Sequence, residues 1–194
     1  MRTMALEAIY PKPRTTCANP EHVIYPYLLR EVTVDAPNQV WCSDITYLPM
    51  HRGFMYLVAV MDWYSRLILS WDISNSLNGD FCITTLENAF AKYGAPDIFN
   101  TDQGSQFTSR KFTECVRQSG ARISMDGKGR AIDNVFIERF WRSVKYEDIY
   151  LRCYQNCGDL YSGLERYMDK YNLRRPHQGL DGQTPEETYH AEDF

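Results

Sequence analysis

Three runs of β-branched, aromatic and aliphatic residues stand close together in the first half of this 194-residue chain. They cover Val40–Leu48, Phe54–Trp63 and Arg66–Ile73, and only short breaks separate them. Such runs predict strands, and connections this short predict an antiparallel meander. The middle run is almost continuously apolar, which indicates a strand that is buried on both faces of a sheet.

The period of the hydrophobic pattern changes after these runs. Apolar residues recur at helical spacing over Asp80–Tyr93, where Asn78 or Asp80 is expected to cap the helix and Gly94 to end it. The order β-β-β-α-β-α-β-α then predicts an α/β fold, in which helices flank both faces of a mixed five-stranded sheet. Its remaining elements are predicted helices over Ser109–Ser119, Asp133–Tyr150 and Leu160–Tyr171, and short strands over Asp97–Asn100 and Arg122–Met125.

The segment before the first strand has a different character. Five prolines punctuate residues 1–37, and little helical or strand periodicity remains there. We therefore expect an N-terminal arm or linker over residues 1–33 and one domain over residues 34–194, which ends in a C-terminal helical tail. The longest apolar run, from Phe54 to Met61, is far too short to span a membrane.

The charge of the chain is unevenly distributed. The formal net charge is −4, which by itself does not indicate a nucleic-acid binder. Between Arg110 and Lys145, however, there are nine basic residues and only four acidic ones. This stretch suits a polyanionic partner, although a solvated helix face would have the same composition.

Six cysteines stand at positions 17, 42, 82, 115, 153 and 157. Cys153 and Cys157 form the one close pair, and no second pair of Cys or His follows at the spacing of a zinc site. We expect all six to be reduced thiols, mostly buried, in a protein of the cytoplasm.

Asp44, Asp102 and Glu138 are the candidate catalytic residues. Asp44 interrupts an apolar strand, where a buried charge needs either a basic partner or a metal ion. Asp102 follows a short strand, so it is either a turn residue or part of a site at the carboxyl end of that strand. Glu138 lies on the polar face of its predicted helix, where a surface pair with Arg142 is the alternative. Three converging carboxylates would repel one another unless divalent cations neutralised them, and such oxygen-ligand sites serve phosphoryl transfer.

Other chemistry finds less support along the chain. Asp62 stands at the second predicted hairpin, where we expect a turn residue or an ion pair with Arg66. No nucleophile elbow is present, which argues against a Ser-His-Asp hydrolase. No glycine-rich phosphate loop is present either, which argues against a nucleotide-hydrolysing enzyme.

Three segments together resemble the integrase-core (DDE) transposases of bacterial insertion sequences, and most of all the insertion-sequence-three type. They are Trp41–Tyr47, Asn100–Phe107 and Asp133–Lys145, and 35 residues separate Asp102 from Glu138. The resemblance covers nearly the whole chain, because it also includes Ala5–Pro13, Tyr171–Leu180 and Thr184–Glu187.

The resemblance implies a ribonuclease-H-like fold of the retroviral-integrase type. It implies DNA strand cleavage and transfer with two Mg²⁺ or Mn²⁺ ions per site, bound by Asp44, Asp102 and Glu138. It also implies that Lys145 touches DNA. Basic and polar residues around Glu138 complete the candidate DNA contacts, which are Lys128, Arg130, Asn134, Arg139, Arg142 and Lys145.

The same resemblance sets expectations about partners. These are DNA at the element ends and at the target, further copies of the chain assembled on DNA, and full-length transposase or the first-frame product. Transposases of this type usually have a helix-turn-helix region upstream, and we expect residues 1–33 to be the remnant after such a region, in a second-frame product or a truncated copy. Two alternatives stay open, namely a nuclease that only hydrolyses DNA and an inactive or inhibitory core that binds DNA or full-length transposase. We expect the protein in the bacterial cytoplasm, associated with the nucleoid when bound to DNA.

Overall fold

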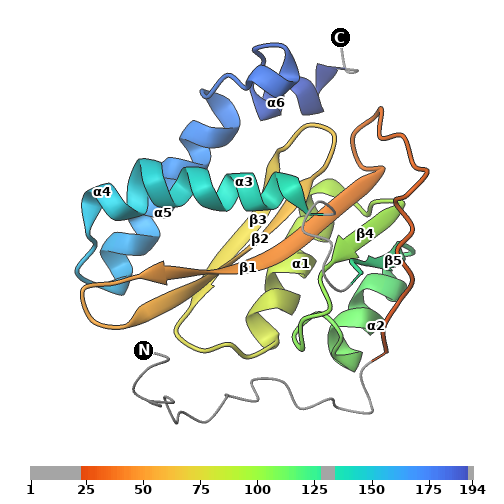
Figure 1. The fold of residues 1–194 in the computed structure, drawn as a ribbon, viewed down its shortest axis with the longest axis horizontal. Coiled ribbons are helices and arrows are strands. Elements are labelled where there is room, and N and C mark those ends of the chain that lie inside the picture. The colour runs from red at the N-terminus through yellow and green to blue at the C-terminus, as the bar shows by residue number, and fades with distance from the viewer. Residues whose placement is uncertain (1–22, 128–133, 192–194) are drawn as a thin grey trace, which may run out of the picture.

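A mixed five-stranded sheet forms the centre of the protein (Figure 1). The computed structural model describes residues 23–127 and 134–191. The strand order is β3-β2-β1-β4-β5, and the strands are β1 (Val40–Pro49), β2 (Phe54–Asp62), β3 (Ile68–Ser74), β4 (Ile98–Thr101) and β5 (Arg122–Met125). β1, β2 and β3 form the predicted antiparallel meander. β4 pairs parallel to β1, and β5 pairs parallel to β4, so the predicted mixed sheet is confirmed.

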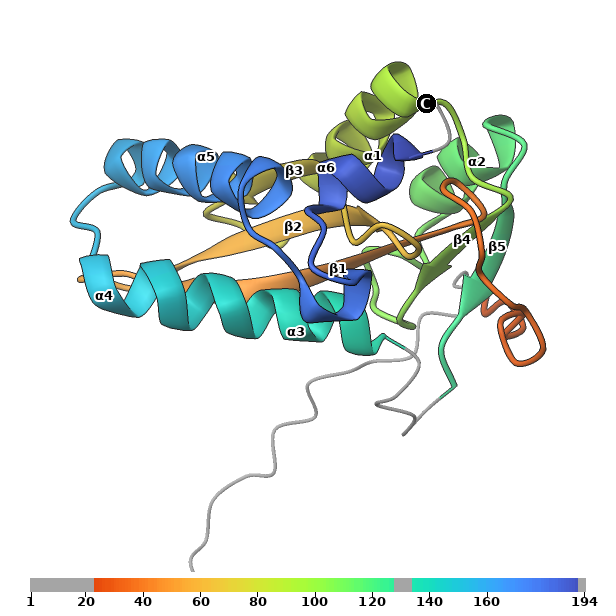
Figure 2. The same cartoon turned by 90° about the horizontal axis from the view of Figure 1, so that it is seen from above.

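Helices cover both faces of this sheet (Figures 1 and 2). α3 crosses one face with α5 beside it, and α1 and α2 lie on the other face. The helical segments in the described residues are α1 (Asp80–Tyr93), α2 (Arg110–Gln118), α3 (Val135–Val144), a π-helical turn (Lys145–Ile149), α4 (Tyr150–Arg152), α5 (Cys157–Leu173), a 3-10 turn (Gln178–Leu180) and α6 (Pro185–Tyr189).

The predicted helices are present, with two differences of detail. α1 has the predicted bounds, and Gly94 ends it at φ 80°. Its N-cap is Gly79 without a side-chain hydrogen bond, so the expected cap by Asn78 or Asp80 is wrong. The predicted long helix over residues 133–150 is helical from Val135 onward, but a π-helical turn interrupts its α-helical geometry.

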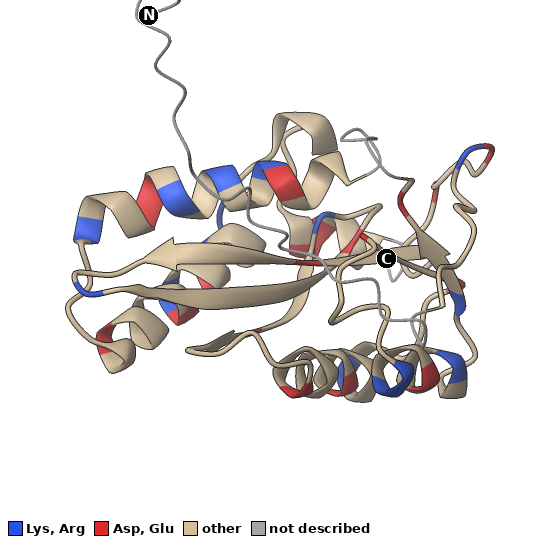
Figure 3. Ribbon diagram, turned by 60° about the horizontal axis from the view of Figure 1, so that its bottom comes forward, with Lys and Arg blue, Asp and Glu red and all other residues tan. Residues whose placement is uncertain are grey.

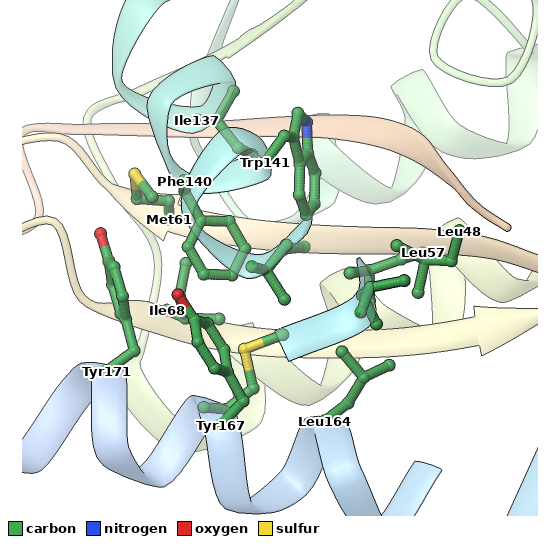
Figure 4. Close-up of a cluster of buried hydrophobic side chains, with 14 of the residues drawn as sticks. Leu48, Leu57, Met61, Ile68, Ile137, Phe140, Trp141, Leu164, Tyr167 and Tyr171 are labelled. Carbon is green, nitrogen blue, oxygen red and sulfur yellow. The ribbon is translucent and has the colours of Figure 1, made fainter. Parts of the chain in front are cut away.

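Two hydrophobic cores result, one on each side of the sheet. The α3–α5 core contains Ile137, Phe140, Trp141 and Val144 of α3 and Leu160, Leu164, Tyr167, Met168 and Tyr171 of α5 (Figure 4). The α1–α2 core contains Phe81, Leu86 and Ala89 of α1 and Phe112 and Val116 of α2. β2 contributes alternate residues to both cores, since Leu57 and Met61 belong to the first and Val58 and Val60 to the second. The predicted burial of this strand on both faces is therefore confirmed.

The chain on either side of the sheet packs against it. Residues 23–39 contain no helix or strand, but Leu29 is buried with Val40 and Ile98. The Leu28 amide donates to Ser124 Oγ at 3.0 Å. At the other end of the described chain, the Tyr189 hydroxyl of α6 donates to Asn38 Oδ1 at 2.9 Å. The tail and the segment before β1 thus meet at one edge of the domain.

The five described cysteines carry free thiols. Cys42 and Cys82 are buried, and Cys115 is half-buried. Cys153 and Cys157 are exposed, so the expectation that the cysteines are mostly buried is wrong for this pair. Cys17 lies outside the described residues. Within the described ranges, no helix has the length and apolar character needed to cross a membrane.

One side chain of α5 forms hydrogen bonds with the backbone of β3, as a neighbouring strand would. The Asn172 carboxamide accepts from the Ile68 amide at 3.0 Å and donates to the Ile68 carbonyl at 2.9 Å. Both groups sit on β3, the outermost strand of the order above, at a residue that is only 3% exposed. Asn172 therefore satisfies backbone groups that the sheet itself leaves without a partner strand.

Asn172→Ala should lower the free energy of unfolding by about 1–3 kcal/mol, because it removes both hydrogen bonds and leaves the Ile68 groups partly shielded from water. Urea denaturation followed by circular dichroism measures the change. Glu165→Ala, at an exposed position of the same helix, is the matched control and should change the value by less than about 0.5 kcal/mol. Equal effects of the two substitutions would contradict the role given to Asn172.

Candidate active site

The register of β1 and β4 brings Asp44 and Asp102 together. The two strands run parallel, and Ser43 pairs with Thr101 as their last matched position. Asp44 and Asp102 are therefore the next residues on neighbouring strands, whose backbones lie about 4.8 Å apart. Both acids also line one small cavity of about 140 Å³.

A tight turn orients Asp102. Its Oδ1 accepts a hydrogen bond from the Gly104 amide at 2.8 Å. A Cβ atom at position 104 would lie 2.8 Å from that same oxygen, so a larger residue there would displace the carboxylate from this position. Asp102 is thus both a turn residue and a residue that lines the cavity. Both interpretations of Asp102 made from the sequence, a turn residue and a residue at the carboxyl end of its strand, therefore hold together.

Trp141 connects Asp44 to the helix that carries Glu138. The Trp141 Nε1–H donates to Asp44 Oδ2 at 2.8 Å, and the rest of the indole is buried in the α3–α5 core. Glu138 stands one helical turn earlier on α3 and is exposed. Among the ion pairs of the described residues, none joins Glu138 to Arg142. The surface pair considered from the sequence therefore does not occupy Glu138.

The pKa of Asp44 depends on its burial and on the charges of the other two acids. The pKa of Asp44 is raised to about 6. Burial is the largest cause and the negative charges of Asp102 and Glu138 add to it, while the hydrogen bonds from Trp141 and the Ile45 amide lower the pKa. Burial also raises the pKa of Asp102, although the Gly104 amide opposes that change. The site therefore holds negative charge at an energetic cost.

The three acids suit a hard divalent cation in their chemistry, because all their donors are carboxylate oxygens. Asp44 and Asp102 share the cavity, and the charge of Glu138 acts on Asp44. They do not form a closed cage, since no three His, Cys, Asp or Glu side chains of residues 23–127 and 134–191 are grouped closely enough to hold one ion. The donor atoms fit a hard divalent cation, although the side chains of the described residues are not drawn together around one point.

Several of the candidate DNA contacts follow the outer side of α3 and the π-helical turn (Figure 3). Arg139 and Arg142 are exposed. Lys145 is half-buried, and burial lowers its pKa while the charge of Asp44 acts in the opposite direction. Asn134 is only 6% exposed and precedes α3 as its N-cap. Lys128 and Arg130 lie outside the described residues.

Asp62 stabilises a turn through hydrogen bonds and does not line this cavity. Its carboxylate is fully buried and accepts from the Ser65 amide at 2.8 Å, the Ser65 hydroxyl at 2.7 Å and the Asn38 amide at 2.9 Å. The turn interpretation of Asp62 is therefore correct. The Arg66 guanidinium lies 3.1 Å from the centre of the Phe136 ring instead.

Solved structures show to which class this fold belongs. The chain matches the HTLV-2 integrase catalytic core domain in complex with magnesium (dimeric form), with a TM-score of 0.65 and 20% identity over 80% of this chain and 98% of that chain. It also matches a simian T-cell lymphotropic virus intasome in complex with PP2A regulatory subunit B56 gamma, with a TM-score of 0.70 and 19% identity over 89% and 60% of the two chains. The expected ribonuclease-H-like fold of the retroviral-integrase type is confirmed.

Sequence relatives then place the chain. An integrase core domain family matches residues 34–131, and a second integrase core domain family matches residues 119–185. The transposase for insertion sequence element IS904 of Lactococcus lactis subsp. lactis (strain IL1403) is 34% identical over 84% of this chain and 66% of that protein. Transposase InsF for insertion sequence IS3A of Escherichia coli (strain K12) is 30% identical over 82% of this chain and 57% of that protein. The chain belongs to the integrase core domain family, and it spans less than two thirds of the length of these transposases.

Asp44→Asn should stabilise the metal-free protein in a pH-dependent way. The pKa of Asp44 is about 6 in the folded chain and 3.8 ordinarily, so the folded state binds a proton more readily and the charged form disfavours folding. Above pH 6 the variant should gain about 2 kcal/mol in the free energy of unfolding, since each pKa unit corresponds to about 1.4 kcal/mol and Asp44 is not fully enclosed. The gain should shrink as the pH falls from 6 to 3.8 and vanish below that range.

Urea unfolding in EDTA, repeated between pH 4 and 8, measures this gain. Asp169→Asn, at an exposed position of α5, is the control and should give no gain that disappears over the same range. A stability difference that stays constant with pH would show that Asp44 carries no such electrostatic cost.

Proposed function

We propose that the chain is the catalytic core of a transposase that cleaves DNA strands and joins them to a target, with Asp44, Asp102 and Glu138 as its metal-binding acids. The observation that carries the proposal is the parallel register, which sets Asp44 beside Asp102. The hydrogen bond from Trp141 to Asp44 connects this pair of acids to α3, the helix that bears Glu138. Curated relatives named as insertion-sequence transposases supply the reaction class.

Magnesium or manganese is the proposed cofactor, with two ions per site. Support comes from the all-carboxylate donor set and from the magnesium named with the HTLV-2 integrase core. When bound, such ions supply activation of the attacking oxygen and stabilisation of the departing one. The residues of this chain hold the acids in place: Gly104 leaves room for the Asp102 turn, and Trp141 fixes one oxygen of Asp44.

DNA is the proposed partner of the basic side of α3. Arg139 and Arg142 are exposed there, and the negative charge of Asp44 raises the pKa of Lys145 against the effect of burial. We assign phosphate contacts to these three residues, and with them to Lys128, Arg130 and Asn134. Such contacts position a strand without reading its sequence. The proposed substrates are the element ends and target DNA, bound by several copies of the chain in the bacterial cytoplasm.

A strand-joining assay tests this function. The DNA is a labelled 3′-hydroxyl oligonucleotide that carries the terminal sequence of the element surrounding the gene, mixed with plasmid target in Mg²⁺ or Mn²⁺. The wild-type chain should form joined product. Asp44→Asn, Asp102→Asn and Glu138→Gln should each lower its yield at least about 1,000-fold, because each removes a charge that holds the ions. Glu165→Gln, an exposed acid on α5, should leave the yield unchanged.

The products separate the alternatives. Cleaved DNA without joined product would indicate a nuclease that only hydrolyses. Neither product, together with inhibition of a full-length transposase, would indicate an inhibitory core. Normal joining by Asp44→Asn would refute the assignment of the acids while leaving the activity in place.

A further inference from the structure

Three aromatic side chains gather at the surface of the β1–β2 hairpin. Tyr47 is 57% exposed and Phe54 is 50% exposed, and Tyr56 beside them is half-buried. Single exposed apolar residues need no explanation, but a contiguous group of large rings marks an interaction surface. We call Tyr47, Phe54 and Tyr56 the hairpin aromatic cluster.

The cluster is ordered by its own contacts. Tyr47 and Tyr56 are direct partners in the antiparallel register of β1 and β2, with ring centres 5.3 Å apart. Phe54 packs edge-on against both, at 5.5 Å from Tyr47 and 5.3 Å from Tyr56. Rings held in this way lose little conformational freedom when a flat ligand binds, because they are already positioned.

The cluster adjoins the candidate active site. Tyr47 and Tyr56 line the same cavity as Asp44 and Asp102. The volume of that cavity, about 140 Å³, is well below the roughly 300–1,000 Å³ of pockets that enclose small ligands. A ligand of nucleotide size must therefore lie across its rim, where the exposed rings are, with only one group reaching the acids.

Charge around the hairpin favours a nucleic acid over a basic peptide. Carboxylates beside aromatic rings would also suit a cation. However, the hairpin between Asp44 and Asp62 carries Arg52 and no acidic residue, and Arg52 is exposed at the turn. A guanidinium at that place attracts a phosphate backbone and repels a basic peptide.

We propose that the hairpin aromatic cluster is a stacking platform for an unpaired nucleobase of the DNA strand whose phosphate lies at Asp44 and Asp102. The proposal rests on the function proposed above and adds how the strand is placed. Every base has a π face, so the platform contributes affinity without requiring a particular sequence. Its task is to hold the nucleotide next to the reacting phosphate out of the duplex stack.

Binding of two oligonucleotides tests the platform without any need for catalysis. One is a fluorescent single strand of thymidines, and the other has the same length and phosphates but abasic sugars in place of the central nucleotides. Fluorescence anisotropy in Ca²⁺ gives both dissociation constants. The wild-type chain should bind the thymidine strand about 10-fold more tightly, within the range that stacking on aromatic side chains supports.

Tyr47→Leu should remove most of this preference and leave the affinity for the abasic strand unchanged. Leucine keeps an apolar side chain at the hairpin, and circular dichroism checks that the variant is folded. Tyr161→Leu is the matched control, because Tyr161 is 45% exposed and packs on Trp71 beside the α3–α5 core. This control should keep the full preference for bases.

The outcomes distinguish the platform from the proposed function. If the wild-type chain joins strands but Tyr47→Leu keeps the preference for bases, the platform is wrong and the function stands. If the preference depends on Tyr47 but no joined product forms, the platform stands and the function fails. A concentration-dependent dimer that Tyr47→Leu abolishes, without any preference for bases, would assign the cluster to a second copy of the chain. Tighter binding of a lysine peptide than of the thymidine strand would also overturn the proposal.

Discussion

The parallel pairing of β4 with β1 is the constraint on which the candidate site depends. It ends at Ser43 and Thr101, so each strand delivers an aspartate at the point where the two strands separate. The cavity lies at this point because β1 continues along β2 after β4 has stopped. A shift of one residue in the register would turn one of the two carboxylates to the other face of the sheet. Strand pairing thus brings the backbones of Asp44 and Asp102 together, and the hydrogen bonds from Trp141 and Gly104 then orient their carboxylates.

The buried negative charge of Asp44 lowers the stability of the fold. Burial raises the pKa of Asp44, and the negative charges of Asp102 and Glu138 add to that rise, so the ionised form of Asp44 disfavours folding. Trp141 offsets part of the cost with one hydrogen bond, and the buried indole ties this bond to the α3–α5 core. A bound cation would convert the remaining repulsion into attraction. Under the proposed function, the same charges would favour the binding of a divalent cation.

Several elements serve packing and the site at the same time. α3 turns Phe140 and Val144 into the core, while Glu138 and Arg142 face solvent on the opposite side. The β1–β2 hairpin likewise contributes Leu48 and Leu57 to the core and its aromatic cluster to the surface. Helical and strand periodicity produce this division, because neighbouring residues point in different directions. A core and an exposed surface can therefore occupy the same short stretch of sequence.

The sequence by itself determined the elements and their order, because local patterns report burial and turn chemistry. It placed all five strands, gave α1 its bounds, and proposed both tasks of Asp102. It did not determine that β4 lies beside β1, that Trp141 bonds to an aspartate 97 residues away, or that Cys153 is exposed. Those facts depend on which surfaces meet after the chain has folded. Periodicity in the sequence predicts that a residue is buried. Only the tertiary structure shows which residues it packs against.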